Sequence, residues 1–154
     1  MNWKIRLVCM FSIILLTTAI TACGKSSATL KDGYFTAEAA EFDSYGWKEY
    51  LCICVSGGKI IHVEYNAHNS SGFIKSWDMD YMRLMNAASG TYPNAYTRYY
   101  SGMLLELQEA AGFDALSGAT ESYHAFIRLA EAVLSGAREG NHKTILVNTT
   151  EKEG

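Results

Sequence analysis

Two β-rich runs joined by a glycine pair place the strongest constraint on the fold of this chain. The runs are residues 50–55 (YLCICV) and 59–65 (KIIHVEY), and Ser56-Gly57-Gly58 separates them. A Gly-Gly pair between two such runs is a signal for a tight β-hairpin turn. Both faces of the first run are apolar, so we expect a central strand covered on both faces, by helices on at least one.

Further strands are predicted on either side of this hairpin. Tyr34, Thr36 and Glu38 alternate with Phe35 and Ala37, which is typical of a strand within residues 30–43. Residues 143–150 (KTILVNTT) are open to two interpretations. They form either a last strand that closes the sheet or a frayed tail.

Three stretches with apolar residues at helical spacing follow the hairpin. Asp78 or Ser76 is the expected N-cap of the first, and Gly90 ends it. The second has Pro93 near its first turn and Gly112 as its C-cap. The third covers about residues 121–135 and stops at Gly136. Strands come first and helices after, which predicts an α+β domain. We expect a small antiparallel sheet with a central hairpin, packed against about three helices.

The first 23 residues have the layout of a secretory signal. Lys4 and Arg6 precede an apolar run over residues 7–20, which is too short to favour a stable membrane span. The run ends in residues 20–23 (ITAC), which resemble a bacterial lipobox, whose cysteine carries lipid and becomes the new N-terminus. An ordinary signal peptide, or an anchor helix with an incidental Cys23, is the alternative.

This leader defines the expected domain organisation. We predict a signal peptide over residues 1–22, the lipidated Cys23 with a flexible tether to residue 30, one domain over residues 31–148 and a tail over residues 149–154. A lipid anchor would hold the protein on the extracytoplasmic face of the cell membrane.

Charge and cysteine content exclude several function classes. The net charge is −3 and no lysine or arginine cluster is present, so we expect no nucleic-acid partner. Cys52 and Cys54 lie two residues apart on a predicted strand, without metal-ligand spacing to other cysteines or histidines. We interpret them as two buried thiols that act as small apolar residues, and we expect no metal site.

A turn of small residues precedes the last predicted helix. Ser117, Gly118, Ala119 and Thr120 stand where the backbone N–H groups of a helix start are unpaired and partly positive. Thr120 as a simple N-cap needs no function. The same turn, free of bulky side chains and flanked by hydroxyls, is also a natural seat for a phosphate.

Residues 114–120 (DALSGAT) resemble the signature of the FMN-binding domain found in sodium-pumping quinone reductase and Rnf subunits and in small exported lipoproteins of membrane-immunogen type. The segments DGYFTAEA and CVSGGKIIHVEY are similar to that family's first strand and hairpin. The resemblance implies that a flavin transferase esterifies Thr120 with the phosphate of FMN, and that Ser117, Gly118 and Ala119 shape the turn. Asp114 would either be read by the transferase or brace the turn.

The resemblance also implies the rest of the FMN site and the partners. Glu121 and Ser122 would join the cofactor-binding residues, and Trp47, Tyr50, Trp77 or Tyr123 could stack on the flavin. The histidines are scattered and none is assigned a catalytic role, although His124 lies one turn past Thr120. The protein would then relay electrons between a membrane donor and an unknown acceptor, rather than act as a substrate-specific enzyme.

Two alternatives stay open at this stage. The domain could hold FMN without a covalent bond, for storage, sensing or delivery. It could also be a structural or antigenic surface lipoprotein in which the turn is only a helix start.

Overall fold

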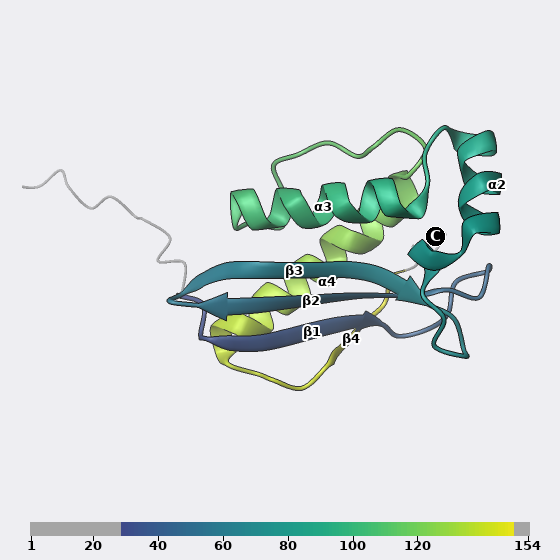
Figure 1. Ribbon diagram of the computed structural model, residues 1–154. Helices are drawn as coiled ribbons and strands as arrows, with labels where there is room; N and C mark the ends of the chain where they lie inside the picture. The colour runs from purple at the N-terminus through teal and green to yellow at the C-terminus, as the bar shows by residue number, and fades with distance from the viewer. Residues whose placement is uncertain (1–28, 150–154) are drawn as a thin grey trace, which may run out of the picture.

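A four-stranded sheet with helices packed against it forms the domain (Figure 1). The computed structural model describes residues 29–149. The predicted signal peptide, Cys23 and the end of the predicted tail, residues 150–154, lie outside the described residues. The strand order is β3-β2-β1-β4, and the α+β prediction is confirmed.

The hairpin has the predicted form, but it lies at one side of the sheet rather than at its centre, because β3 is an edge strand. Strand β2 (Lys48–Ser56) and β3 (Lys59–His68) pair antiparallel around Gly57 and Gly58. Their φ values of 61° and 74° lie in the left-handed region that glycine adopts without strain. Strand β1 (Gly33–Ala39) pairs antiparallel with the other edge of β2, which makes β2 an interior strand.

The C-terminal segment forms a strand rather than a tail. Strand β4 (Ile145–Val147) pairs parallel with β1, so the sheet is mixed and has one parallel edge. The long connection that a parallel pair needs contains the last helix.

Helices cover one face of the sheet. Helix α3 (Pro93–Leu107) packs on β3, and α4 (Thr120–Glu139) packs on β1 and β2 (Figure 1). Leu51, Ile53 and Val55 point into this core, and Cys52 and Cys54 alternate with them toward the open face. The expectation of cover on both faces is therefore wrong. The two thiols are free and only partly buried.

Two predicted helix ends are wrong for identifiable reasons. Helix α4 continues through Gly136 to Glu139. Glycine at this position does not end the helix but allows β4 to pack closely, because a Cβ there would lie 2.7 Å from Cδ1 of Ile145. Helix α3 ends at Leu107, before Gly112, because Gln108 turns into the left-handed region at φ 61°. The Gln108 amide exchanges two hydrogen bonds with the backbone of Ile60, of 2.7 and 3.0 Å.

Helix α2 (Met79–Ser89) stands at one end of the sheet, beside the 3₁₀ turn η1 (Lys75–Trp77) (Figure 1). Its predicted boundaries are confirmed, because the Asp78 carboxylate accepts a hydrogen bond from Tyr81 N and Gly90 forms the C-cap. None of its residues is fully buried, but its partly buried Met85 packs against the core. No helix among residues 29–149 is long and apolar enough to cross a membrane.

Candidate cofactor site between α2 and α4

A cavity of about 830 Å³ lies between α2, the N-terminus of α4, η1 and the loop that joins β1 to β2. This volume is within the range of about 300–1,000 Å³ that small-molecule sites occupy. Its apolar wall comes from the side chains of Trp47, Tyr81, Leu84 and Met85. The predicted small-residue turn forms part of the opposite wall through Gly118 and Ala119.

The turn requires glycine at position 118 for two reasons. Gly118 has φ 78°, and a Cβ there would overlap the carbonyl oxygen of Ser89 at the end of α2. The backbone of the turn therefore touches the backbone of α2 directly. This contact holds one wall of the cavity against the other.

A buried tyrosine fixes the shape of the same turn. The Tyr100 hydroxyl accepts a hydrogen bond from Leu116 N and donates one to the Ala119 carbonyl oxygen, both 3.1 Å long. Its ring lies in the core and is 0% exposed. The sequence carries no signal for this role of Tyr100, because its helical spacing indicates only a core position.

Thr120 is the first residue of α4 and lines the cavity. The prediction that Thr120 is the N-cap is wrong: Ala119 occupies that position, and no side chain caps the helix. Ala119 is the last residue with non-helical φ and ψ, and Thr120 is already helical. The Thr120 hydroxyl therefore makes no capping hydrogen bond. It is left exposed at the partly positive end of a 20-residue helix.

The remaining predicted site residues divide into two groups. Glu121 and Ser122 line the cavity beside Thr120, whereas Asp114 and Ser117 are exposed and do not line it. Among the aromatic residues considered for stacking, Trp47 lines the cavity, and Tyr50, Trp77 and Tyr123 do not. His124 is exposed on α4 and also lies outside the cavity lining.

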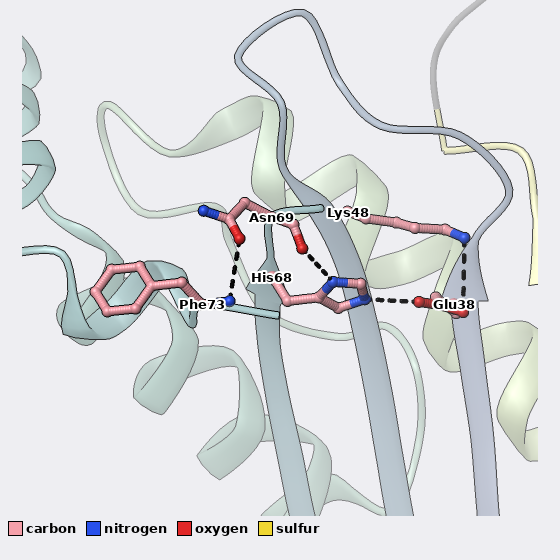
Figure 2. A network of polar contacts seen from close by, with 5 residues as sticks. All are labelled: Glu38, Lys48, His68, Asn69 and Phe73. Atoms are coloured by element: carbon pink, nitrogen blue, oxygen red, sulfur yellow. Dashed lines mark hydrogen bonds and ion pairs between the residues drawn. The ribbon is translucent and has the colours of Figure 1, made fainter. Parts of the chain in front are cut away.

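His68 has a structural position near the ends of three strands (Figure 2). Its Nε2 lies 2.8 Å from Oε1 of Glu38 on β1, and its Nδ1 lies 3.0 Å from the carbonyl oxygen of Asn69. These two acceptors raise the pKa of His68 above its usual value. Lys48 on β2 adds a 3.7 Å ion pair to the same carboxylate, which ties the strands together.

The polar end of the cavity contains a carboxyl and an ammonium from separate elements. Lys75 on η1 is only 5% exposed, and its Nζ lies 5.8 Å from the centre of the Trp47 ring and 5.1 Å from that of Tyr81. Burial lowers the pKa of Lys75. Burial likewise raises the pKa of Glu49 to about 7, against the opposing effects of Lys75 and of hydrogen bonds with Tyr65 and Ser122.

Sequence analysis missed both of these residues. Glu49 could have been identified from its spacing, because residues 49, 51 and 53 of a strand lie on the same face, and Leu51 and Ile53 are apolar core positions. Lys75 had none, because only the fold brings η1 to the end of the sheet. Within residues 29–149, no group of three His, Cys, Asp or Glu side chains is arranged to hold a metal ion.

A curated relative shows the class of protein, which is a small lipoprotein. The chain is 36% identical over 133 residues to the 15 kDa lipoprotein of Treponema pallidum (strain Nichols). The aligned region covers 86% of this chain and 93% of that protein. The chain belongs to the family of this lipoprotein. Family membership indicates a membrane-anchored lipoprotein, and lipid attachment at Cys23 stays a prediction.

Two solved structures have the same fold. The CPE2226 protein of Clostridium perfringens is 40% identical with a TM-score of 0.74, over 77% of this chain and 98% of that chain. A protein of Clostridium thermocellum is 28% identical with a TM-score of 0.50, over 70% of this chain and 92% of that chain. No protein-family model matches the chain, so the resemblance to the FMN-binding domain stays a prediction.

The contact between Gly118 and Ser89 can be tested by adding a single methyl group. We expect Gly118→Ala to lower the free energy of unfolding by about 2 kcal/mol or more, because it adds both backbone strain and a clash with α2. Gly72→Ala is the matched control, since Gly72 has a similar φ of 82° and nothing within 4 Å of its added Cβ. Equal losses in urea denaturation would show that the contact contributes nothing.

Glu49 predicts a pH dependence of stability with a defined sign. Its pKa is raised from 4.5 to about 7 on folding, so its contribution is full below pH 4.5 and is lost as the pH rises through about 7. The loss corresponds to about 3 kcal/mol. Glu49→Gln should therefore match the wild type at low pH and exceed it in stability above pH 7.

The matched control for this experiment is Glu41→Gln, which removes an exposed carboxylate from the same cavity. Its free energy of unfolding should follow the wild-type pH profile. A Glu49→Gln profile parallel to the wild type in urea denaturation would contradict the assignment.

Proposed function

We propose that the protein is a membrane-anchored, extracytoplasmic flavoprotein that carries FMN on Thr120 and transfers electrons. The observation behind this proposal is the position of the Thr120 hydroxyl. It makes no capping hydrogen bond at the N-terminus of α4, and Thr120 lines a cavity that has an aromatic side. The match of residues 114–120 to the FMN-binding signature supports the same assignment.

The size of the cavity and its aromatic side fit FMN. Thr120 and Glu121, the first residues of α4, are exposed and line the cavity, so a phosphate can approach the first N–H groups of the helix. Trp47 and Tyr81 provide aromatic surface for a flat ring system. When bound, FMN supplies the redox chemistry, and the protein orients the ring and controls the access of water.

The charge of the cavity favours covalent attachment over simple binding. Glu41, Asp43, Glu49 and Glu121 line it, against the single ammonium of Lys75. This excess of carboxylates opposes the entry of a free phosphate dianion. An ester bond retains the phosphate in spite of that repulsion, and it prevents loss of FMN outside the cytoplasm.

The attachment requires a flavin transferase with FAD as the second substrate. Oγ1 of Thr120 forms a new bond to the phosphorus of the FMN half while the pyrophosphate bond of FAD breaks. AMP leaves, and the hydroxyl proton is released to solvent. The exposed position of Thr120 makes its hydroxyl accessible to another enzyme.

The intact mass of the mature protein tests the proposal directly. Co-expression with a flavin transferase should add one FMN less one water to the wild type and to Thr120→Ser, which keeps the hydroxyl. Thr120→Val keeps the side-chain shape but loses the hydroxyl, so it should gain nothing. Addition of mass to the Thr120→Val variant would contradict attachment at this residue.

The same samples distinguish the two alternatives. An unchanged mass together with yellow protein after addition of free FMN would indicate a non-covalent FMN-binding module. If the wild type neither gains mass nor binds FMN, the proposal is wrong. The family would then be better described as structural or antigenic surface lipoproteins.

A further inference from the structure

We propose that Glu49 and Lys75 form the subsite that recognises the polar edge of the bound ring, and that ring binding is coupled to the uptake of one proton by the Glu49 carboxyl. The inference rests on the proposed function, since it assumes that an isoalloxazine ring occupies the cavity. It assigns roles to two residues that are far from the FMN-binding signature in the sequence.

The geometry of the cavity supports this subsite. Trp47 and Tyr81 lie edge to face with ring centroids 5.7 Å apart, and the Lys75 ammonium lies close to both rings. Glu49 lines the same cavity from β2. A flat ring that packs on Trp47 or Tyr81 inside this cavity shares it with a carboxyl and an ammonium, which can bond its polar edge.

Lys75 has no ion-pair partner among residues 29–149 within the distance at which ion pairs form. A nearly buried ammonium is costly unless it is paired or hydrogen-bonded. Its cation–π contacts with Trp47 and Tyr81 offset part of this cost. The carbonyl oxygens and ring nitrogens of an isoalloxazine can accept the remaining hydrogen bonds of the ammonium.

Glu49 is the group in this cluster that changes charge near neutral pH. The titratable groups that interact with it are Asp43, Tyr65, Lys75, Tyr81, Tyr96 and Tyr100, and Glu41 and Glu121 line the same cavity. The four phenols have pKa values raised above 10, so they stay neutral in this range. Asp43 accepts backbone hydrogen bonds of 2.8 Å from the N–H groups of Tyr45 and Trp47.

Ring binding should shift the protonation of Glu49 in one direction. A ring that fills the cavity removes water from the carboxyl, and loss of water disfavours the charged form. The neutral carboxyl can also donate a hydrogen bond to a ring carbonyl, which the carboxylate cannot do. Binding therefore prefers protonated Glu49 and weakens as the pH rises above the pKa of this group.

Riboflavin is the probe that isolates this subsite, because it carries the ring but no phosphate. Its dissociation constant for the unmodified protein can be measured by fluorescence from about pH 5 to about pH 9. For the wild type we expect little change below pH 7, and an increase of up to about tenfold per pH unit above it.

Three variants separate the role of Glu49 from a general charge effect. Glu49→Gln should bind riboflavin with an affinity that is independent of pH, because its amide remains a hydrogen-bond donor. Glu41→Gln removes a carboxylate from the same cavity and should keep the wild-type profile. Lys75→Met removes the cation that stabilises charged Glu49, so the onset of weakening should move to higher pH.

The outcomes distinguish this inference from the proposed function. If riboflavin does not bind, or if Glu49→Gln has the wild-type pH profile, the inference is wrong. If FMN is esterified at Thr120 but the pH profile of riboflavin binding does not depend on Glu49, the proposed function holds and the ring subsite is wrong. A Glu49-dependent profile without any esterification would support the ring subsite and contradict the covalent attachment.

Discussion

The direct contact between the Gly118 turn and the end of α2 is the constraint on which the candidate site depends. Helix α2 has no fully buried residue, and it contacts the core through partly buried Met85 and the ring of Trp47 through Tyr81. The turn meets it at Ser89, where only glycine fits. On the other side, the hydroxyl of buried Tyr100 fixes the turn by bonding to Leu116 and Ala119. The core thus positions the turn, the turn and the core contacts together position α2, and the cavity lies between α2 and the end of the sheet.

The turn can be interpreted as a simple helix start or as a cofactor attachment site, and the two interpretations assign different roles to Thr120. If the turn served only to begin a helix, its hydroxyl residue would be expected at the N-cap, bonded to the backbone. The structure has Ala119 there instead, and Thr120 follows with its hydroxyl uncommitted beside a cavity. Four carboxylates and one ammonium line that cavity. This combination suits a covalently held cofactor better than a freely exchanging phosphate.

Local sequence signals predicted the parts of the fold that depend on local chemistry. The Gly57-Gly58 turn and the caps at Asp78 and Gly90 were identified because each needs only its neighbours in sequence. The predicted helix end at Gly136 is wrong, because the glycine serves to let the distant strand β4 pack closely against the helix. The Glu49–Lys75 subsite was also missed, because it joins a strand to a 3₁₀ turn through tertiary packing.

A crystal structure of the protein produced with a flavin transferase would test the central claim most directly. The account predicts electron density continuous with Oγ1 of Thr120, which leads into the cavity and ends in a flat ring against Trp47 and Tyr81. The ring edge should lie within hydrogen-bond distance of Glu49 or Lys75. A Thr120 side chain without added density, in protein that was exposed to the transferase and FAD, would contradict it.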